Sequence, residues 1–421
     1  MEENISTISL YEARCYMRTN ILVVALGYPT KENPIEGSFF KEQVDFLKNE
    51  YDCTVLVYRE YCKGVVWGAK RKYSELEYTQ GIKQYYPIVY ISYFQRCIEI
   101  IGSIIRKKRR SEAAVGIYKS ELYRKSRKKI INSIIDDLKL EYDVVYCITA
   151  QGSAFQALQF AEIKGKPFVI SEHRPYPHPG WSTIDVEKEA FEKADCFFAI
   201  GKDKIRQIML QNIKPKRISY LGNLVDESRF IYNPIEHECK TLMIVAAFSY
   251  FKNFDMLVET INKLVDMTSN DFRVIIAGYG ANKGYVGNVE TLEKMVGDSK
   301  FSEKTELIRE VKRDDICSVY NRADAFVMTS IQEGQPMVAL EAACCGLPIF
   351  STKCGGVEDY VTDDIGRLVD ITDSDLLAFY LKEFIEGKIK FNNIAIREKV
   401  VSIFGRDAFM NRFKSEIDRL L

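Results

Sequence analysis

The stretch Glu333–Gly356 reads E-G-Q-P-M-V-A-L-E-A-A-C-C-G-L-P-I-F-S-T-K-C-G-G. The apolar run Ala325–Ser330 precedes it and the run Pro348–Thr352 lies within it, and both have the composition of buried strands. Pro336 can open a helix between the two runs, and Gly346 can close that helix in a left-handed conformation. The stretch therefore predicts a strand–loop–helix–strand crossover, which is the building unit of a parallel sheet.

Two carboxylates in this stretch are candidates for ligand binding. Glu333 follows the first strand at its carboxyl end, the edge at which open α/β sheets bind ligands. Glu341 is the only charged residue between Met337 and Phe350, and an unpaired carboxylate in apolar surroundings is unfavourable by several kcal/mol. We therefore expect a partner for Glu341, and the two hydroxyls of a ribose could donate to it. The alternative is that Glu341 faces solvent or caps a neighbouring helix.

The spacing E-x7-E from Glu333 to Glu341, followed by G-L-P and by Gly355 and Gly356, resembles the retaining glycosyltransferases of family 4. The resemblance implies an α/β protein of GT-B architecture, in which two doubly wound Rossmann-like domains face each other across a cleft. It also implies an enzyme, a hexosyltransferase-type glycosyltransferase that moves a sugar from a nucleotide diphosphate sugar to an acceptor hydroxyl.

Composition narrows the possible partners and the compartment. The 421 residues suffice for two domains, and 59 basic against 59 acidic side chains give no general case for nucleic acid. Three histidines and 11 scattered cysteines, none in C-x-x-C, show no zinc-ligand pattern, so no metal is expected. We find no signal peptide and no run of about 18 apolar residues. The sequence therefore predicts a cytoplasmic protein, which could lie at the inner face of the cell membrane.

The first half of the chain contains two candidate acceptor-side features. The buried strand Asn20–Leu26 is followed by Gly27–Phe40, which lacks G-x-G-x-x-G and so argues against a nicotinamide site. Gly37, Phe39 and Gln43, which straddle the end of this loop, resemble the family's acceptor-docking segment, although a plain connecting loop explains them nearly as well. His173 follows the strand Pro167–Ser171 and resembles the family's histidine, which contacts the sugar; a structural histidine is the alternative.

A basic and apolar segment lies between these features. Apolar residues from Ile98 to Ile105 fit one helical face, and Arg106–Arg110 follow directly. This pattern suits peripheral contact with an anionic membrane, whereas a solvated basic helix is the plain alternative.

The second half repeats the α/β pattern. Lys252 follows the strand Leu242–Phe248, at a position where the resemblance implies a cation on the donor's diphosphate, while Ala247 replaces the arginine usual there. Gly278 would let the backbone approach a ligand, although a plain turn is the simpler explanation. The domains are predicted as residues 1–234 on the acceptor side and 235–403 on the donor side, with a helix over 404–421 packing back on the first domain.

The resemblance assigns the site residues as follows. Glu341 would bind the ribose, Glu333 the donor sugar, and the amides of Gly334 and Gln335 would lie near the sugar or phosphate. Lys252 and Gly278 are the other two residues predicted to bind the donor. The catalytic candidates are His173 and Glu333.

We expect a glycan or lipid-linked acceptor, as in bacterial surface polysaccharide or glycolipid assembly, and no cofactor besides the donor. The alternatives are a nucleotide-sugar epimerase of the same fold, or a non-catalytic subunit of a polysaccharide assembly complex. A glycosidase using the same carboxylate pair is less favoured, because both residues come from one domain.

Overall fold

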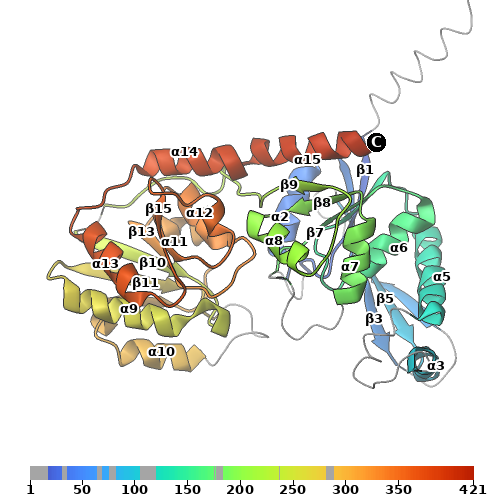
Figure 1. Cartoon of the computed structure of the whole chain (residues 1–421), viewed down its shortest axis with the longest axis horizontal. Coiled ribbons are helices and arrows are strands. Elements are labelled where there is room, and N and C mark those ends of the chain that lie inside the picture. Colours follow the sequence, from blue (N-terminus) through green and yellow to red (C-terminus); the bar gives the residue numbers. More distant parts are fainter. Residues whose placement is uncertain are drawn as a thin grey trace, which may run out of the picture. The chain divides into compact units, whose positions relative to one another are not determined.

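The computed structural model describes residues 18–30, 36–63, 69–74, 82–104, 120–174, 176, 184–236, 238–280 and 289–421. These residues form two compact α/β units (Figure 1). Unit 1 comprises the described residues up to Ala199 together with Gln207–Ser219 and Lys414–Leu421. Unit 2 comprises Ile200–Arg206 and Tyr220–Phe413.

The sheet of unit 1 has the order β3-β5-β2-β1-β6-β7-β8-β9, and β4 adds to it antiparallel to β5. The pairings of β1 with β2 and β6, and of β7 with β6 and β8, are parallel. The strands are β1 (Asn20–Val24), β2 (Asp52–Leu56), β3 (Arg59–Cys62), β4 (Ala69–Ser74), β5 (Lys83–Ile91), β6 (Val144–Cys147), β7 (Phe168–Ser171), β8 (Cys196–Ala199) and β9 (Ile218–Tyr220).

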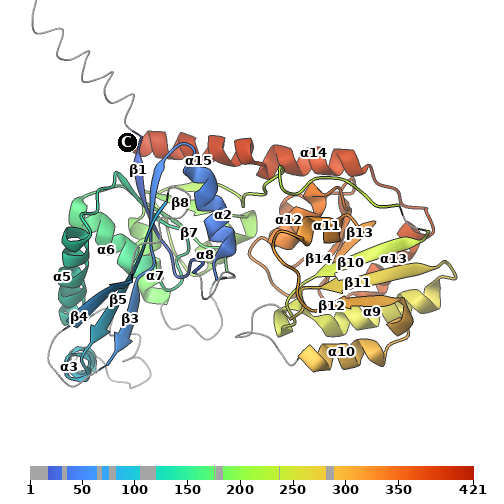
Figure 2. The same ribbon diagram turned by 180° about the vertical axis from the view of Figure 1, so that it is seen from behind.

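Helices accompany this sheet, and Figure 2 shows α2 and α5 from behind. Every residue of β6, β7 and β8 is buried, as expected for parallel strands with helices on both faces. The helices are α2 (Ser38–Leu47), α3 (Tyr93–Ile104), α5 (Glu121–Asp137), α6 (Ala154–Lys164), α7 (Ile184–Lys193) and α8 (Lys202–Leu210).

The sheet of unit 2 has the order β12-β11-β10-β13-β14-β15, and every pairing in it is parallel. Its strands are β10 (Lys240–Val245), β11 (Phe272–Ala277), β12 (Thr305–Ile308), β13 (Ala325–Met328), β14 (Ile349–Thr352) and β15 (Gly366–Val369). Its helical elements are η3 (Tyr250–Lys252), α9 (Phe254–Met267), α10 (Val289–Gly297), η4 (Ser302–Lys304), α11 (Ile316–Tyr320), α12 (Met337–Cys344), η5 (Val357–Asp359), α13 (Ser374–Ile385) and α14 (Asn393–Phe404), and α15 (Arg406–Leu420) follows.

Side chains of the central strand β10 alternate between two hydrophobic cores. Leu242 and Ile244 pack with α9, α10 and α13 on one face of the sheet, whereas Met243 and Val245 pack with α11, α12 and α14 on the other. This two-residue period places helices on both faces of a doubly wound sheet (Figure 1). The predicted α/β class is confirmed.

The predicted crossover around Glu333–Gly356 is present as β13, α12 and β14. Helix α12 begins at Met337 rather than at Pro336, which is its N-cap, and Gly346 takes φ +81 just past its end. The sequence missed β3 and β4, and it missed β5, where Tyr85 and Tyr90 lie. The apolar face predicted near Ile98 lies on α3.

The residues before Pro234 belong with the second sheet. Val225 and Phe230 are buried in the core that α12 and α14 share, and the long segment of unit 2 begins at Tyr220, whereas the predicted boundary lies at residue 234. At the other end, Lys414–Leu421 belong to unit 1, where Arg217 donates to Glu416 through Nε and Nη2 at 2.7 and 2.9 Å.

Within the described ranges no helix combines the length and the apolar character needed to cross a membrane. Arg106–Arg110, the basic segment predicted to contact a membrane, lie outside the described residues.

Candidate functional site

The order of the strands in unit 2 identifies the edge at which a ligand is expected. From β10 the chain moves to β11 and β12 on one side and then returns to β13 on the other, so the direction of winding reverses between β10 and β13. Open α/β sheets bind ligands outside the carboxyl ends of the strands at such a reversal. Lys252 follows β10 and Glu333 follows β13, so both predicted residues lie at this point.

Lys252 and Glu333 form an ion pair there. Lys252 Nζ lies 2.5 Å from Glu333 Oε1, and the two side chains are 23% and 16% exposed. Two loops far apart in the sequence thus bring a cation and a carboxylate together at a partly open position. When a donor binds, the ion pair can open, so that the cation contacts a diphosphate and the carboxylate accepts a hydrogen bond from a sugar hydroxyl.

Hydrogen bonds between the loops hold this pair in place. Thr329 Oγ1 lies 3.1 Å from the carbonyl oxygens of both Lys252 and Asn253, which share its single hydroxyl proton. The Ile331 N–H donates to the Phe251 carbonyl at 2.8 Å. The loop after β13 is therefore fastened to η3, and η3 positions the ammonium group of Lys252.

The glycine pair after β14 packs against the loop that carries Glu333. Gly355 and Gly356 have φ values of +99 and +75, a backbone conformation that residues other than glycine rarely adopt. A Cβ on Gly356 would lie 2.6 Å from the Gly334 carbonyl oxygen, and one on Gly355 would lie 2.8 Å from that of Glu333. The two glycines are needed because the backbone of the Glu333–Gly334 loop packs directly on them.

Glu341 has protein partners in this structure. Its side chain is 1% exposed, Arg313 Nη1 lies 2.6 Å from its Oε1, and Tyr320 Oη donates to its Oε2 at 3.1 Å. Burial raises the pKa of Tyr320 and the neighbouring Glu341 raises it further, so the phenol stays protonated and donates. The partner expected for Glu341 is thus supplied from the segment before β13, and its contact with a ribose stays a prediction.

The sequence analysis missed Arg313 and Tyr320. They stand 28 and 21 residues before Glu341, and only the packing of α11 against α12 reveals them. The Arg313 side chain is 34% exposed, so solvent reaches Arg313 but not the buried carboxylate of Glu341 that it pairs with.

Gln335 supports the loop that carries Glu333. Its side-chain oxygen accepts from the Asn223 N–H at 2.6 Å, and its carbonyl oxygen accepts from Asn223 Nδ2 at 3.0 Å. The side chain is buried in this contact, and the contact of the Gly334 and Gln335 amides with a donor stays a prediction. Gly278 lies at the end of β11 with φ +73, and its N–H donates to the Ile308 carbonyl at 2.8 Å.

His173 belongs to unit 1, where it follows β7 at the carboxyl edge of that sheet. Its ring centroid lies 5.6 Å from that of Phe39 and 5.3 Å from that of Phe40, and its Nε2 lies 3.3 Å from Ser171 Oγ. The rings of Phe39 and Phe40 on α2 and the hydroxyl of Ser171 at the end of β7 thus hold the imidazole in place.

Glu172, the residue before His173, was not singled out from the sequence. Its fully buried carboxylate accepts from Thr149 Oγ1 at 3.1 Å, from the Gln151 N–H at 2.7 Å and from the Arg174 N–H at 2.8 Å. These bonds tie the loop after β6 to the loop after β7. A charged residue directly past a buried strand was the signal that could have identified it.

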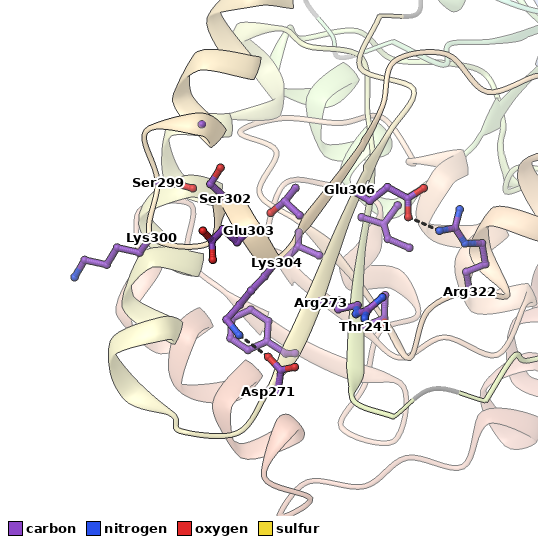
Figure 3. Close-up of a pocket in the computed structure, with 15 residues that line it drawn as sticks. Thr241, Asp271, Arg273, Ser299, Lys300, Ser302, Glu303, Lys304, Glu306 and Arg322 are labelled. Atoms are coloured by element: carbon purple, nitrogen blue, oxygen red, sulfur yellow. Dashed lines mark hydrogen bonds and ion pairs between the residues drawn. The ribbon is translucent and has the colours of Figure 1, made fainter.

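A cavity of about 900 Å³ lies at the opposite edge of the unit 2 sheet (Figure 3). Thr241, Arg273 and Glu306 stand near the amino ends of their strands and line it. Arg322 pairs with Glu306 at its rim. This cavity is therefore separate from the ion pair of Lys252 and Glu333, which lies at the carboxyl edge.

Among the residues that the structure describes, no group of three or more histidine, cysteine, aspartate or glutamate side chains is placed to hold a metal ion. The expectation of a reaction without metal or cofactor stays a prediction.

Comparison with protein families gives one match that contains most of the donor-side residues. Residues 225–399 match the model described as "Glycosyl transferases group 1", so this part of the chain is similar to that group. The match includes Lys252, Gly278, Glu333 and Glu341.

Curated relatives match over similar lengths. A phosphatidylinositol N-acetylglucosaminyltransferase subunit of Arabidopsis thaliana is 25% identical over 228 residues, which are 53% of this chain and 49% of the relative. D-inositol 3-phosphate glycosyltransferase of Mycobacterium sp. (strain KMS) is 26% identical over 195 residues, 44% of this chain and 43% of the relative. The matched region thus spans about half the length of these curated relatives or somewhat less.

Solved structures resemble nearly the whole chain. The apo form of the lipopolysaccharide outer core galactosyltransferase WaaB has a TM-score of 0.68 at 18% identity and covers 96% of this chain and 100% of its own. The Anabaena protein HepE, solved in complex with UDP, has a TM-score of 0.65 at 13% identity over 96% of this chain and 100% of its own. At these identities the likeness establishes the fold, GT-B with two Rossmann-like domains.

Proposed function

We propose that this chain is a retaining glycosyltransferase that moves a sugar from a nucleotide diphosphate sugar to an acceptor hydroxyl. The observation that carries the proposal is the ion pair of Lys252 and Glu333 at the reversal point of the unit 2 sheet. The group 1 match over the same residues and the GT-B fold support it.

In the proposed reaction the bond between the sugar's anomeric carbon and the diphosphate oxygen breaks. The acceptor oxygen forms its bond to that carbon on the same face, and the acceptor proton passes to the departing diphosphate. Lys252 offsets the charge that develops on the diphosphate, which is where a preorganised cation lowers the barrier. Glu333 accepts hydrogen bonds from the sugar, Glu341 from the ribose, and His173 orients the sugar.

The proposal is tested by release of nucleoside diphosphate. A thermal-shift screen across nucleotide sugars first identifies the donor, because a ligand at 100 times its dissociation constant stabilises by about 2.7 kcal/mol. With that donor, release should depend on added acceptor and fall in Glu333→Gln. Release at the same rate without acceptor would indicate hydrolysis, and conversion of the donor to a stereoisomer would indicate an epimerase. Binding of no nucleotide sugar would favour a non-catalytic subunit.

We also propose that the acceptor is a glycan or a lipid-linked molecule, presented at an anionic membrane surface in polysaccharide or glycolipid assembly. Tyr93, Phe94 and Ile101 on α3 support this, since each is more than half exposed on one helix. The basic residues Arg106–Arg110 follow that helix in the sequence. Exposed aromatic side chains that are followed in the sequence by a run of basic residues suit an interfacial contact.

A further inference from the structure

A chain of buried polar side chains in unit 1 leads to His173. It starts at Gln43 on α2, whose Nε2 donates to Tyr146 Oη at 3.3 Å. Tyr146 Oη lies 3.1 Å from Ser171 Oγ, and Ser171 Oγ lies 3.3 Å from His173 Nε2. Gln43, Tyr146 and Ser171 are at most 4% exposed, so water does not compete for these bonds.

The direction of each bond follows from the number of protons available. Ser171 has one hydroxyl proton, and its shortest contact is with the Ile148 carbonyl oxygen at 2.7 Å, a group that can only accept. Because Ser171 donates this proton to Ile148, its Oγ can act only as an acceptor toward Tyr146 and His173. Tyr146 therefore donates to one of them, and His173 donates to the other through Nε2.

We propose that Ser171 is a positioning residue that holds the neutral imidazole of His173 with its proton on Nε2 and its lone pair on Nδ1. Phe39 and Phe40 pack against the ring, which opposes a rotation that would exchange the two edges. The hydrogen bond to Ser171 persists when the ring becomes charged, so the proton that the ring gains and loses is the one on Nδ1.

The inference bears on the proposed function and, in this respect, rests on it. Nδ1 is buried in the donor-free chain, so the groups that cover it must move before it can accept a hydrogen bond from a sugar hydroxyl or carry a proton toward one. Ser171 then determines which hydrogen bond the site offers, although it touches no substrate itself. The assignment of the ring proton does not depend on that function, because it follows from the contacts of the donor-free chain.

The direct test is the tautomer of the wild-type protein. The chain has only 3 histidines, so a long-range proton–nitrogen correlation spectrum of histidine-labelled protein is simple to assign, with His173→Asn identifying the relevant ring. At a pH where the ring is neutral we expect a single tautomer with the proton on Nε2. A proton on Nδ1, or a mixture of tautomers, would overturn the proposal.

Variants distinguish positioning from general loosening of the fold. Ser171→Ala should speed exchange of the Nε2 proton with water about tenfold or more, the effect of losing one hydrogen bond, and Ser171→Thr should restore it. Tyr146→Phe is the matched control, since it removes a neighbouring hydroxyl but leaves Ser171 bonded to Ile148, and its His173 exchange should stay near wild type. Equal acceleration in Ser171→Ala and Tyr146→Phe would contradict the assigned role.

The two proposals can fail separately. If the expected tautomer is found and no sugar transfer is detected, the proposed function fails while the role of Ser171 stands. If transfer is detected and the proton lies on Nδ1, the reverse holds.

Discussion

At the scale of single residues, Lys252 and Glu333 neutralise each other in the donor-free chain. A ligand that binds either side chain must replace this contact, so the measured affinity is the difference between two interactions. Because Ala247 stands where the family resemblance implies an arginine, we expect Lys252 to carry more of the phosphate recognition than it would in a site with two cations.

We expect Lys252→Ala to weaken a nucleoside diphosphate by about one to two orders of magnitude, the net value of a hydrogen bond to a charged group. The uncharged nucleoside should bind almost as before. Calorimetric titration of both ligands, with and without EDTA, checks this. Equal losses for the two ligands would mean that Lys252 shapes the loop, and loss of wild-type binding in EDTA would reveal a metal site.

Glu341 and Glu333 should respond differently to replacement. Glu341→Ala should raise the dissociation constant of the nucleoside diphosphate, whereas Glu333→Ala should lower turnover more than nucleotide binding. Glu341→Gln is the control, because it can still accept from Tyr320 but loses the charge that pairs with Arg313. Titration calorimetry with the free nucleotide measures the first effect, and equal loss of affinity in both alanine variants would reverse the assignment.

The sequence singled out Glu333 and Glu341 by their places after a strand and in a helix, and it singled out Lys252 by the family resemblance. It could not identify Arg313 as the partner of Glu341, nor Tyr146 and Ile148 as the groups that hold Ser171 beside His173. The roles of these residues depend on contacts between segments that are far apart in the sequence, and the local sequence pattern does not predict such contacts.

At the scale of elements, the glycine turn after β14 tests whether the site depends on close backbone packing. Gly356 and Gly387 have nearly the same φ, +75 and +73, but a Cβ on Gly387 meets no atom within 4 Å. Gly387→Ala should cost about 1–2 kcal/mol of unfolding free energy from backbone strain alone. Gly356→Ala should cost about 1–3 kcal/mol more, because its Cβ would collide with Gly334 and Gln335. Guanidinium unfolding of both variants measures the difference, and equal costs would contradict the packing argument.

The contact between α5 and α7 should make unit 1 sensitive to acid. Hydrogen bonds from Arg124 lower the pKa of Glu189 to about 2, and Lys193 adds to the effect. Since this pKa lies below the ordinary value of 4.5, the stabilisation is complete above that value and is lost as the pH falls toward 2.

Glu189→Gln should therefore be less stable than wild type by about 1–2 kcal/mol near pH 6, allowing for solvent screening. The difference should disappear as the pH falls below 4.5 toward 2. Glu192→Gln, on the same helix but with its carboxylate 3.7 Å from Lys188, is the matched control. Denaturation at a series of pH values is the measurement, and a difference that does not change with pH would exclude the ion pair as its cause.

Continuous apolar runs predicted most of the central strands, because strands covered on both faces need no polar positions. β3 (REYC) and β4 (AKRKYS) were missed for the opposite reason. They lie away from the centre of the sheet, and their charged side chains give no such run.

At the scale of the whole molecule, we expect peripheral binding to anionic vesicles through α3 and the basic residues that follow it. Replacing Arg106–Arg110 with serine should reduce flotation with such vesicles most at low salt, because charge attraction is screened over about 8–10 Å at physiological ionic strength. Replacing Tyr93 and Phe94 with serine should reduce flotation at all salt concentrations. Unchanged flotation in both variants would exclude this surface.

The domain boundary predicted at residue 234 differs from the division of the chain by its contacts. A motif marks where a segment resembles a family, but whether Val225 and Phe230 pack with the first or the second core is a question of contacts. Val225 and Phe230 therefore belong to unit 2, although the sequence pattern placed them in the first domain.

The composition of unit 1 has a consequence for how the protein is made. Domains fold largely as they leave the ribosome, the N-terminal one first. Here unit 1 needs Lys414–Leu421, which are synthesised after all of unit 2, including the ion pair partner Glu416. Unit 2 is thus the first to have all its residues, and we expect unit 1 to complete its packing only after the last residues of the chain have been synthesised.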